Sequence, residues 1–197
     1  MILLVNGPNL NLLGEREPDV YGHETLADVE RTVADTCAAY GVEVKAFQSN
    51  WEGALLDFLQ EHRAVAQGVI LNPGALTHTS RALHDCLRAL PCPAVEVHIS
   101  NVHAREAWRR ESVVAPAALG QITGLGTAGY YYAALHLCSR IVAAQAEGEA
   151  HAPAVEPGLG AEHGKYAYGA VREDALPSEP AEEVPVDITA RGDYEPL

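Results

Sequence analysis

Two kinds of hydrophobic pattern alternate along the first 140 residues. Short runs rich in valine, isoleucine and leucine are typical of buried strands, and the longer stretches between them place apolar residues at helical spacing. This alternation predicts an α/β domain built on a parallel sheet. The five predicted strands are Ile2–Asn6, Val42–Gln48, Gly68–Asn72, Ala94–Ile99 and Gln121–Leu125.

Helices are predicted between these strands and after the last one. The first has a capping box, Thr25-x-x-Asp28, and Gly41 ends it. Its predicted inward face holds Leu26, Val29, Val33 and Tyr40. The other helices cover residues 52–62, 79–90 and 127–144. Elements of this size and order predict a flavodoxin-like three-layer sandwich, with a five-stranded parallel sheet in the order 2-1-3-4-5.

The composition changes at about residue 146. Residues 141–197 carry 3 Lys and Arg against 12 Asp and Glu, whereas residues 1–140 carry 10 against 15. Half of the 12 prolines lie beyond Ala150, and hydrophobic periodicity ends there. We therefore expect one catalytic or binding domain at residues 1–145 and a disordered, acidic, proline-rich tail at residues 146–197.

Charge and apolar content exclude some classes of partner and indicate the cellular compartment. The formal net charge is -14, and a basic face that could neutralise phosphates is missing, so we expect neither nucleic acid nor a membrane surface as a partner. The apolar opening lacks the charged flank and cleavage site of a signal peptide, and no run is long enough to span a membrane. The four cysteines have no C-x-x-C spacing and are expected to be buried free thiols. These features predict a cytoplasmic protein.

Polar residues collect at the carboxyl ends of the predicted strands, where open parallel sheets bind ligands. Asn6-Gly7-Pro8-Asn9 follows the first strand and Asn72-Pro73-Gly74 the third. In the fourth, the two-residue period places Glu96 and His98 on one face. A glutamate beside a histidine orients the ring and favours its protonated form, so His98 is a candidate general acid. The alternative is a strand-end histidine bonded to the backbone.

The loop from Gly14 to Gly22 is long and charged for a connection between a strand and a helix. Its notable residues are Arg16 and Tyr21. A tyrosine is a poor base at neutral pH unless a nearby guanidinium favours tyrosinate, and Arg16 could supply that charge. The alternative is an exposed arginine and a packing tyrosine.

Several other chemistries are disfavoured. The only lysines, Lys45 and Lys165, lie away from the predicted site, which argues against Schiff-base catalysis. The Gly-x-Gly-x-x-Gly at residues 124–129 follows the last strand, so we interpret it as close packing of a helix on the sheet. His78 and His84 would diverge by about 120° on a helix, and no H-E-x-x-H pair occurs. We therefore expect no metal and no other cofactor. A flavodoxin-like nucleotide- or phosphate-binding module and a metal-dependent hydrolase stay as alternatives.

Several segments together resemble the type II 3-dehydroquinase family over about residues 1–140. They are residues 6–14 (NGPNLNLLG), 16–22 (REPDVYG), 72–80 (NPGALTHTS), 96–106 (EVHISNVHARE) and 120–130 (GQITGLGTAGY). The resemblance implies a lyase that dehydrates 3-dehydroquinate to 3-dehydroshikimate through an enolate, without a cofactor, in the shikimate pathway or, alternatively, in quinate catabolism. Leu76, His84 and Trp108 depart from the family pattern without removing a catalytic group.

The resemblance also implies roles for individual residues. Tyr21 would be the base, as tyrosinate, with Arg16 holding down its pKa. Asn9 would position a water on the enolate, and His98, oriented by Glu96, would protonate the departing hydroxyl.

Substrate binding is implied for a second set of residues. Ring hydroxyls would contact Asn72, His78 and Arg109, and the carboxylate would contact Asn72 and the backbone amides of Ile99 and Ser100. Arg105 would assist the loop or the tyrosinate. Asp85 would reach the site of a neighbouring subunit, because the family forms a homododecamer built as a tetramer of trimers.

Overall fold

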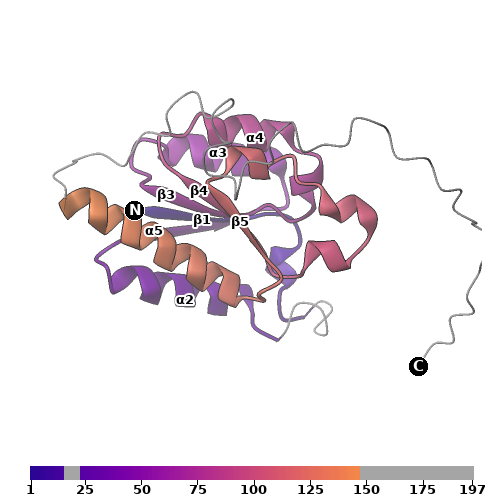
Figure 1. Cartoon of the computed structure of the whole chain (residues 1–197), viewed down its shortest axis with the longest axis horizontal. Coiled ribbons are helices and arrows are strands. Elements are labelled where there is room, and N and C mark those ends of the chain that lie inside the picture. The colour runs from indigo at the N-terminus through magenta and orange to yellow at the C-terminus, as the bar shows by residue number, and fades with distance from the viewer. Residues whose placement is uncertain (16–22, 147–197) are drawn as a thin grey trace, which may run out of the picture. The chain divides into compact units, whose positions relative to one another are not determined.

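The structure is a computed structural model that describes residues 1–15 and 23–146. Its core is built around a five-stranded parallel sheet (Figure 1). Its strands are β1 (Ile2–Asn6), β2 (Val44–Gln48), β3 (Gly68–Asn72), β4 (Ala94–His98) and β5 (Gly120–Thr123). They are hydrogen-bonded in the order β2-β1-β3-β4-β5, and every pair is parallel. The predicted flavodoxin-like strand order is confirmed.

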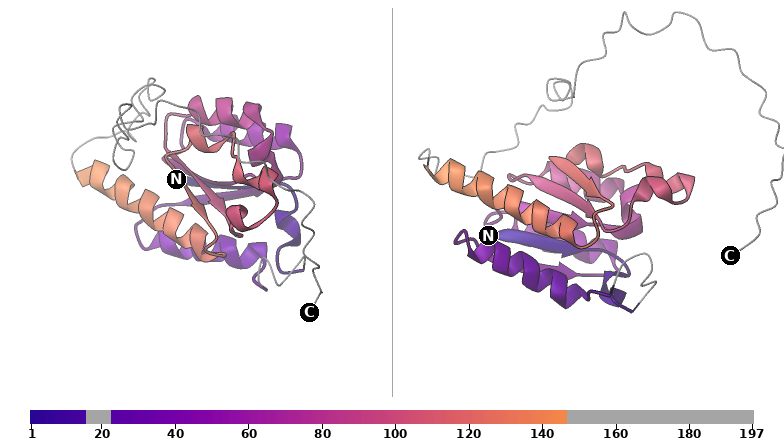
Figure 2. Two further views of the ribbon diagram at one scale, coloured as in Figure 1. Left: turned by 45° about the vertical axis from the view of Figure 1, so that its right-hand side comes forward. Right: turned by 60° about the horizontal axis from the view of Figure 1, so that its bottom comes forward.

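Helices cover both faces of this sheet (Figures 1 and 2). α2 (Leu26–Ala38) and α5 (Ala128–Ala146) lie on one face, and α3 (Glu52–His62) and α4 (Arg81–Arg88) lie on the other. Alternate residues of β1 enter the two cores, since Ile2 and Leu4 pack with α2 and α5 while Leu3 and Val5 pack with α3 and α4. A central strand that is apolar on both faces is what a sheet covered on both sides requires.

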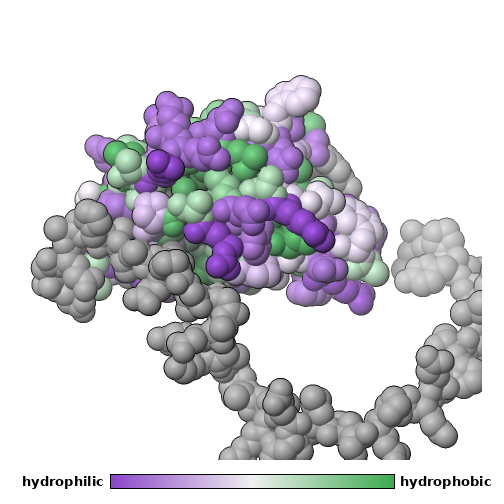
Figure 3. Space-filling view, turned by 90° about the horizontal axis from the view of Figure 1, so that it is seen from above, coloured by the Kyte–Doolittle hydropathy of each residue, from purple (hydrophilic) through white to green (hydrophobic). Residues whose placement is uncertain are grey.

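The outer surface on the side of α3 and α4 mixes hydrophilic and hydrophobic residues (Figure 3). Both helices turn leucines inward, with Leu55 and Leu59 on α3 and Leu83 and Leu87 on α4 at most 3 % exposed. Their inward faces thus account for the core on this side, and polar residues are left for the solvent.

The first helix follows the prediction at its start and departs from it at its end. The capping box is formed: the Asp28 N–H donates to the Thr25 hydroxyl, and the Thr25 N–H donates to the Asp28 carboxylate at 2.9 Å. The predicted inward position of Tyr40 is wrong, because α2 ends at Ala38 and Tyr40 is 38 % exposed. Cys37 is the buried residue of that last turn.

Strand boundaries differ from the prediction where residues expected in a strand belong to a turn instead. The Val42 N–H donates to the Cys37 carbonyl at 3.0 Å, so Val42 belongs to the turn that closes α2 and β2 starts two residues later. β5 ends at Thr123 because Gly124 has a φ of 82°, which breaks the extended backbone. β4 ends at His98, one residue early.

The predicted packing role of the Gly-x-Gly-x-x-Gly segment is confirmed at Gly129. A Cβ atom there would meet Val97 Cγ1 at 3.2 Å and Ile122 Cγ2 at 3.3 Å. α5 therefore approaches β4 and β5 closely at its first turn.

Short 3-10 helices, which the sequence did not predict, connect the strand ends. They are η1 (Leu10–Leu12), η2 (Gly74–His78), η3 (Val102–Ala104), η4 (Ala107–Arg110) and η5 (Ala115–Ala117). The predicted loop residues 16–22 and the predicted tail beyond Ala146 lie outside the described residues. Within the described part of the chain, no helix is both long and apolar enough to cross a membrane.

Candidate active site

A pocket of about 140 Å³ lies at the carboxyl ends of β1, β3 and β4, where strand order reverses. Eight of the residues singled out in the sequence line it: Asn9, Asn72, His78, His98, Ile99, Ser100, Arg105 and Arg109. Leucines and a valine that follow β1 and β4 form its apolar wall. The pocket thus combines a polar floor with a hydrophobic side, as small-molecule sites commonly do.

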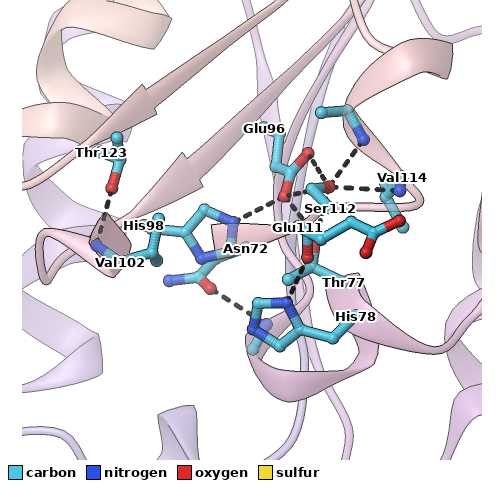
Figure 4. Close-up of polar contacts among 12 residues, drawn as sticks. Asn72, Thr77, His78, Glu96, His98, Val102, Glu111, Ser112, Val114 and Thr123 are labelled. Carbon is cyan, nitrogen blue, oxygen red and sulfur yellow. Dashed lines mark hydrogen bonds and ion pairs between the residues drawn. The ribbon is translucent and has the colours of Figure 1, made fainter. Parts of the chain in front are cut away.

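His98 and Glu96 are in direct contact at the end of β4. His98 Nε2 lies 2.6 Å from Glu96 Oε1, and the two residues are 7 % and 0 % exposed. The neighbouring positions predicted from the two-residue period are therefore present. Figure 4 shows the second ring nitrogen of His98 on the side of Asn72, so Nδ1 is left for a ligand in the pocket.

Two hydroxyl groups, in addition to His98, form hydrogen bonds with the Glu96 carboxylate. The Thr77 hydroxyl donates to Glu96 Oε1 at 2.5 Å, and Ser112 Oγ lies 3.2 and 3.1 Å from the two carboxylate oxygens (Figure 4). Ser112 Oγ also accepts the backbone N–H groups of Val114 and Ala115, at 3.2 and 2.8 Å. Because these amides occupy its lone pairs, the Ser112 proton is left for an acceptor, either the Glu96 carboxylate or the Thr77 hydroxyl 2.7 Å away.

The surroundings of Glu96 favour its ionised form. Burial raises the pKa of this carboxyl, but hydrogen bonds from His98 and Thr77, with the charge of His98, outweigh burial and hold the pKa below its ordinary value. A glutamate that stays ionised accepts the Nε2–H of His98 and orients the ring. The pair can therefore deliver a proton to an atom in the pocket.

Asn72 supplies an amide on the floor of the pocket. It is 4 % exposed at the end of β3. Its Nδ2 donates to the Tyr130 hydroxyl at 2.7 Å, and its Oδ1 accepts the Gly74 N–H at 3.1 Å. The side chain is thus fixed by partners from two different elements.

Asn9 is the one non-glycine residue of the described chain with a positive φ, at 69°. Asparagine tolerates this left-handed conformation better than most residues. The Asn50 side chain accepts the Asn9 N–H at 2.9 Å, which anchors the turn after β1. Asn9 is exposed and lines the pocket, so its side chain is accessible to a ligand.

Cationic and imidazole groups come from the segment after β4 and from η2. Arg109 Nε donates to Glu106 Oε2 at 2.6 Å, and its guanidinium lies 4.0 Å from the Trp108 ring centre. The Trp108 ring also meets His78 edge-on, with ring centres 5.0 Å apart. The Arg109 hydrogen bond lowers the pKa of Glu106 to about 2. Arg105 donates to the Ser100 hydroxyl at 3.2 Å.

The remaining predicted residues are not among the described residues that line this pocket. Arg16 and Tyr21 lie outside the described residues. Asp85 is exposed on α4 and is not part of the pocket lining of this chain.

Four residues that support the site were not predicted from the sequence: Asn6, Ser112 and Tyr130, and the Thr77 hydroxyl as a partner of Glu96. Asn6 ends a strand that was predicted correctly, which was the only signal for it. Tyr130 and Ser112 lie 58 and 16 residues away from the groups that they support. Such separations are invisible to local periodicity.

Across residues 1–15 and 23–146, no cluster of three or more His, Cys, Asp or Glu side chains is arranged to hold a metal ion. His78 and His84 each bond a backbone carbonyl through Nδ1, at 2.6 and 2.9 Å.

The fold and the pocket together define a flavodoxin-like α/β protein with a buried histidine–glutamate pair suited to proton transfer. The family model described as "Dehydroquinase class II" matches residues 1–138. The chain belongs to the class II dehydroquinase family.

Curated relatives and solved structures agree with this membership. A 3-dehydroquinate dehydratase from Rhodopseudomonas palustris is 55 % identical over 141 residues, which cover 71 % of this chain and 93 % of the relative. A catabolic 3-dehydroquinase from Penicillium rubens is 53 % identical over 137 residues, covering 70 % of this chain and 88 % of the relative. A crystal structure of a type II dehydroquinase from Propionibacterium acnes superposes with a TM-score of 0.67 at 37 % identity, covering 70 % of this chain and 95 % of that one.

Proposed function

We propose that this chain is a 3-dehydroquinate dehydratase, which converts 3-dehydroquinate to 3-dehydroshikimate and water. The observation that carries the proposal is the buried His98–Glu96 pair on the wall of a polar pocket, 2.6 Å apart, in a chain that the family model matches over residues 1–138. The names of the similar proteins from Rhodopseudomonas palustris and Penicillium rubens support the substrate.

The reaction removes a proton from C2, next to the C3 ketone, and then the hydroxyl from C1. The electrons of the C2–H bond first form an enolate, which then expels the C1 hydroxyl as the C1=C2 double bond forms. The product is a conjugated enone. One group must accept the C2 proton, and another must protonate the leaving hydroxyl.

His98 is the proposed acid. Its Nε2 is held by Glu96, whose lowered pKa keeps the carboxylate ionised, and this contact orients the ring so that Nδ1 is available to the substrate hydroxyl. The Thr77 and Ser112 hydroxyls act on the substrate only through Glu96, as positioning groups.

Tyr21 is the proposed base, as tyrosinate, and Arg16 is the proposed source of positive charge beside it. This part rests on the resemblance of the segment REPDVYG at residues 16–22 to the family motif. Asn9 is the proposed holder of a water on the enolate oxygen, and its exposure at the pocket edge supports that role.

Substrate binding is assigned to side chains that line the pocket. Asn72, His78 and Arg109 are proposed to bind ring hydroxyls, and the Ile99 and Ser100 amides, with Asn72, the carboxylate. Arg105 is proposed to assist the loop or the tyrosinate.

Asp85 is proposed to serve a neighbouring subunit of a homododecamer, and its exposure on α4 is consistent with this.

The same reaction serves biosynthesis of shikimate and breakdown of quinate. We propose the biosynthetic role first. The catabolic role is the second candidate, and the 53 % identity to an enzyme named as catabolic favours it. Genomic neighbours, biosynthetic or quinate-metabolising, distinguish the two.

The function is tested by following ultraviolet absorbance after purified full-length protein is mixed with 3-dehydroquinate. We expect absorbance to grow as the conjugated enone forms, at an unchanged rate with a metal chelator present. Loss of turnover on chelation would favour the metal-dependent hydrolase. No turnover, together with a nucleotide or flavin that co-purifies, would favour the binding module.

A further inference from the structure

Three buried polar side chains form a chain of hydrogen bonds beneath the pocket. Asn6 ends β1, Asn72 ends β3 and Tyr130 lies in the first turn of α5; they are 0 %, 4 % and 0 % exposed. Asn72 Nδ2 donates to the Tyr130 hydroxyl at 2.7 Å, and that hydroxyl donates to Asn6 Oδ1 at 2.7 Å. Of the three, only Asn72 lines the pocket.

The Gly74 N–H determines which group donates and which accepts in each of these hydrogen bonds. A backbone N–H can only donate, so the Asn72 atom that faces the Gly74 N–H at 3.1 Å must be Oδ1. The Asn72 atom that faces Tyr130 is then the NH₂ group, and the Tyr130 oxygen must accept from it. A hydroxyl has one proton, and here it goes to Asn6 Oδ1.

The phenol keeps that proton. Burial raises the pKa of Tyr130 far above its ordinary value. At neutral pH the hydroxyl is therefore a donor to Asn6 and an acceptor for Asn72.

We propose that Tyr130 and Asn6 are positioning residues for ligand binding, which hold the Asn72 amide so that it offers the pocket an N–H donor. Tyr130 uses one of the two Nδ2 hydrogens, and the second is available to an oxygen of the substrate. The proposal rests on the proposed function, since the ligand is 3-dehydroquinate, whose carboxylate and hydroxyl oxygens are acceptors. A rotated Asn72 amide would set its NH₂ against the Gly74 N–H, two donors in contact.

The first test compares KM and kcat for 3-dehydroquinate in wild type and Tyr130→Phe. The variant loses one of the two anchors of Asn72, so we expect KM to rise roughly threefold to tenfold while kcat stays within about twofold, because the lost contact aids substrate and transition state alike. Tyr132→Phe is the matched control, because it removes the same hydroxyl from a half-exposed position of α5. It should leave both constants unchanged.

A second pair of variants separates positioning from loss of stability. Asn6→Asp keeps an acceptor for the Tyr130 proton, since burial favours the neutral acid, whose carbonyl replaces the amide oxygen. Asn6→Leu removes the acceptor and keeps the branching of the side chain, with a larger volume. We expect Asn6→Leu to raise KM as Tyr130→Phe does. In Asn6→Asp, KM should stay within about twofold of the wild-type value. Both results are expected whatever the thermal midpoints of the two variants.

The outcomes are distinguishable. A KM unchanged in both Tyr130→Phe and Asn6→Leu, with only the thermal midpoint lowered, would show that these residues have a structural role and overturn the positioning role alone. Absence of turnover in wild type would instead overturn the proposed function, and with it the role of Asn72 toward this substrate.

Discussion

At the scale of single residues, the site is built on buried polar groups that satisfy one another. Glu96 is fully buried, yet His98, Thr77 and Ser112 surround its carboxylate with hydrogen-bond donors. A buried charge is tolerated only with such partners. The His98–Glu96 contact could be predicted because both residues lie on one strand. Thr77 lies in the short helix η2 and Ser112 in the loop after η4, and the conformation of both segments depends on tertiary contacts.

The Thr77 hydroxyl is expected to stabilise the protein through the ionised form of Glu96. Because the pKa of Glu96 is lowered on folding, its contribution is present above the unfolded pKa and is lost as pH falls through the folded pKa. Thr77→Val should therefore cost about 1–3 kcal/mol near pH 7, and the cost should shrink as pH falls through the lowered pKa of Glu96. Thermal midpoints measured across this pH range test this.

The control for this variant is Thr79→Val, which makes the same substitution at an exposed position. It should lower the midpoint little and equally at every pH. A Thr77→Val cost that stays constant from pH 7 down to a pH below the lowered pKa of Glu96 would contradict the link to Glu96 ionisation.

The four cysteines are expected to be unreactive in the folded protein. All are buried free thiols, as predicted, and burial raises the pKa of Cys37 to about 12 and that of Cys92 to about 11. Burial also raises the pKa of Cys86 and Cys138. At pH 8 a thiol-specific disulfide reagent should label the native protein at least about tenfold more slowly than the denatured protein, in which all four react. Rapid labelling of even one native thiol would contradict this.

At the scale of elements, the sequence predicts the type and order of the helices and strands well and their ends less well. A short continuous apolar run identifies a strand such as β3, because the sheet is buried on both faces. Ends depend on turns: Val42 closes α2 rather than opening β2, and Tyr40 is left exposed beyond the helix. The 3-10 helices that carry Thr77, His78 and Arg109 are too short to show a period.

Two glycines at equivalent helical positions are expected to respond differently to alanine. Gly53 and Gly129 are each the second residue of a helix, α3 and α5. No atom lies within 4 Å of a Cβ added at Gly53, whereas at Gly129 it would press on Val97 and Ile122. Gly53→Ala should add up to about 1 kcal/mol to the free energy of unfolding, from helix propensity. Gly129→Ala should subtract about 1 kcal/mol, because overpacking outweighs that gain.

Chemical denaturation of the two variants beside wild type measures both effects. Equal stabilisation by the two substitutions would show that α5 can move away from the sheet, contrary to the close packing described here.

At the scale of the whole molecule, the parallel sheet sets the position of the chemistry. The ends of β1, β3 and β4 bring together residues that are far apart in the chain, from Asn9 to Arg109, around one pocket. The rule for open α/β sheets predicted this place from strand order alone. Predicting which side chains fill the pocket required the resemblance to a family as well, because several lining residues come from irregular segments.

The proposed division of work between an acid and a base is tested most directly with His98→Asn and 3-dehydroquinate in deuterated water. Exchange of the C2 proton and formation of the enone are measured in the same sample. Because His98 acts after the enolate forms, we expect C2 exchange to continue while enone formation falls by about 10²–10⁴-fold. Enone formation at the wild-type rate would contradict the role of His98, and with it an acid–base dehydration at this pocket.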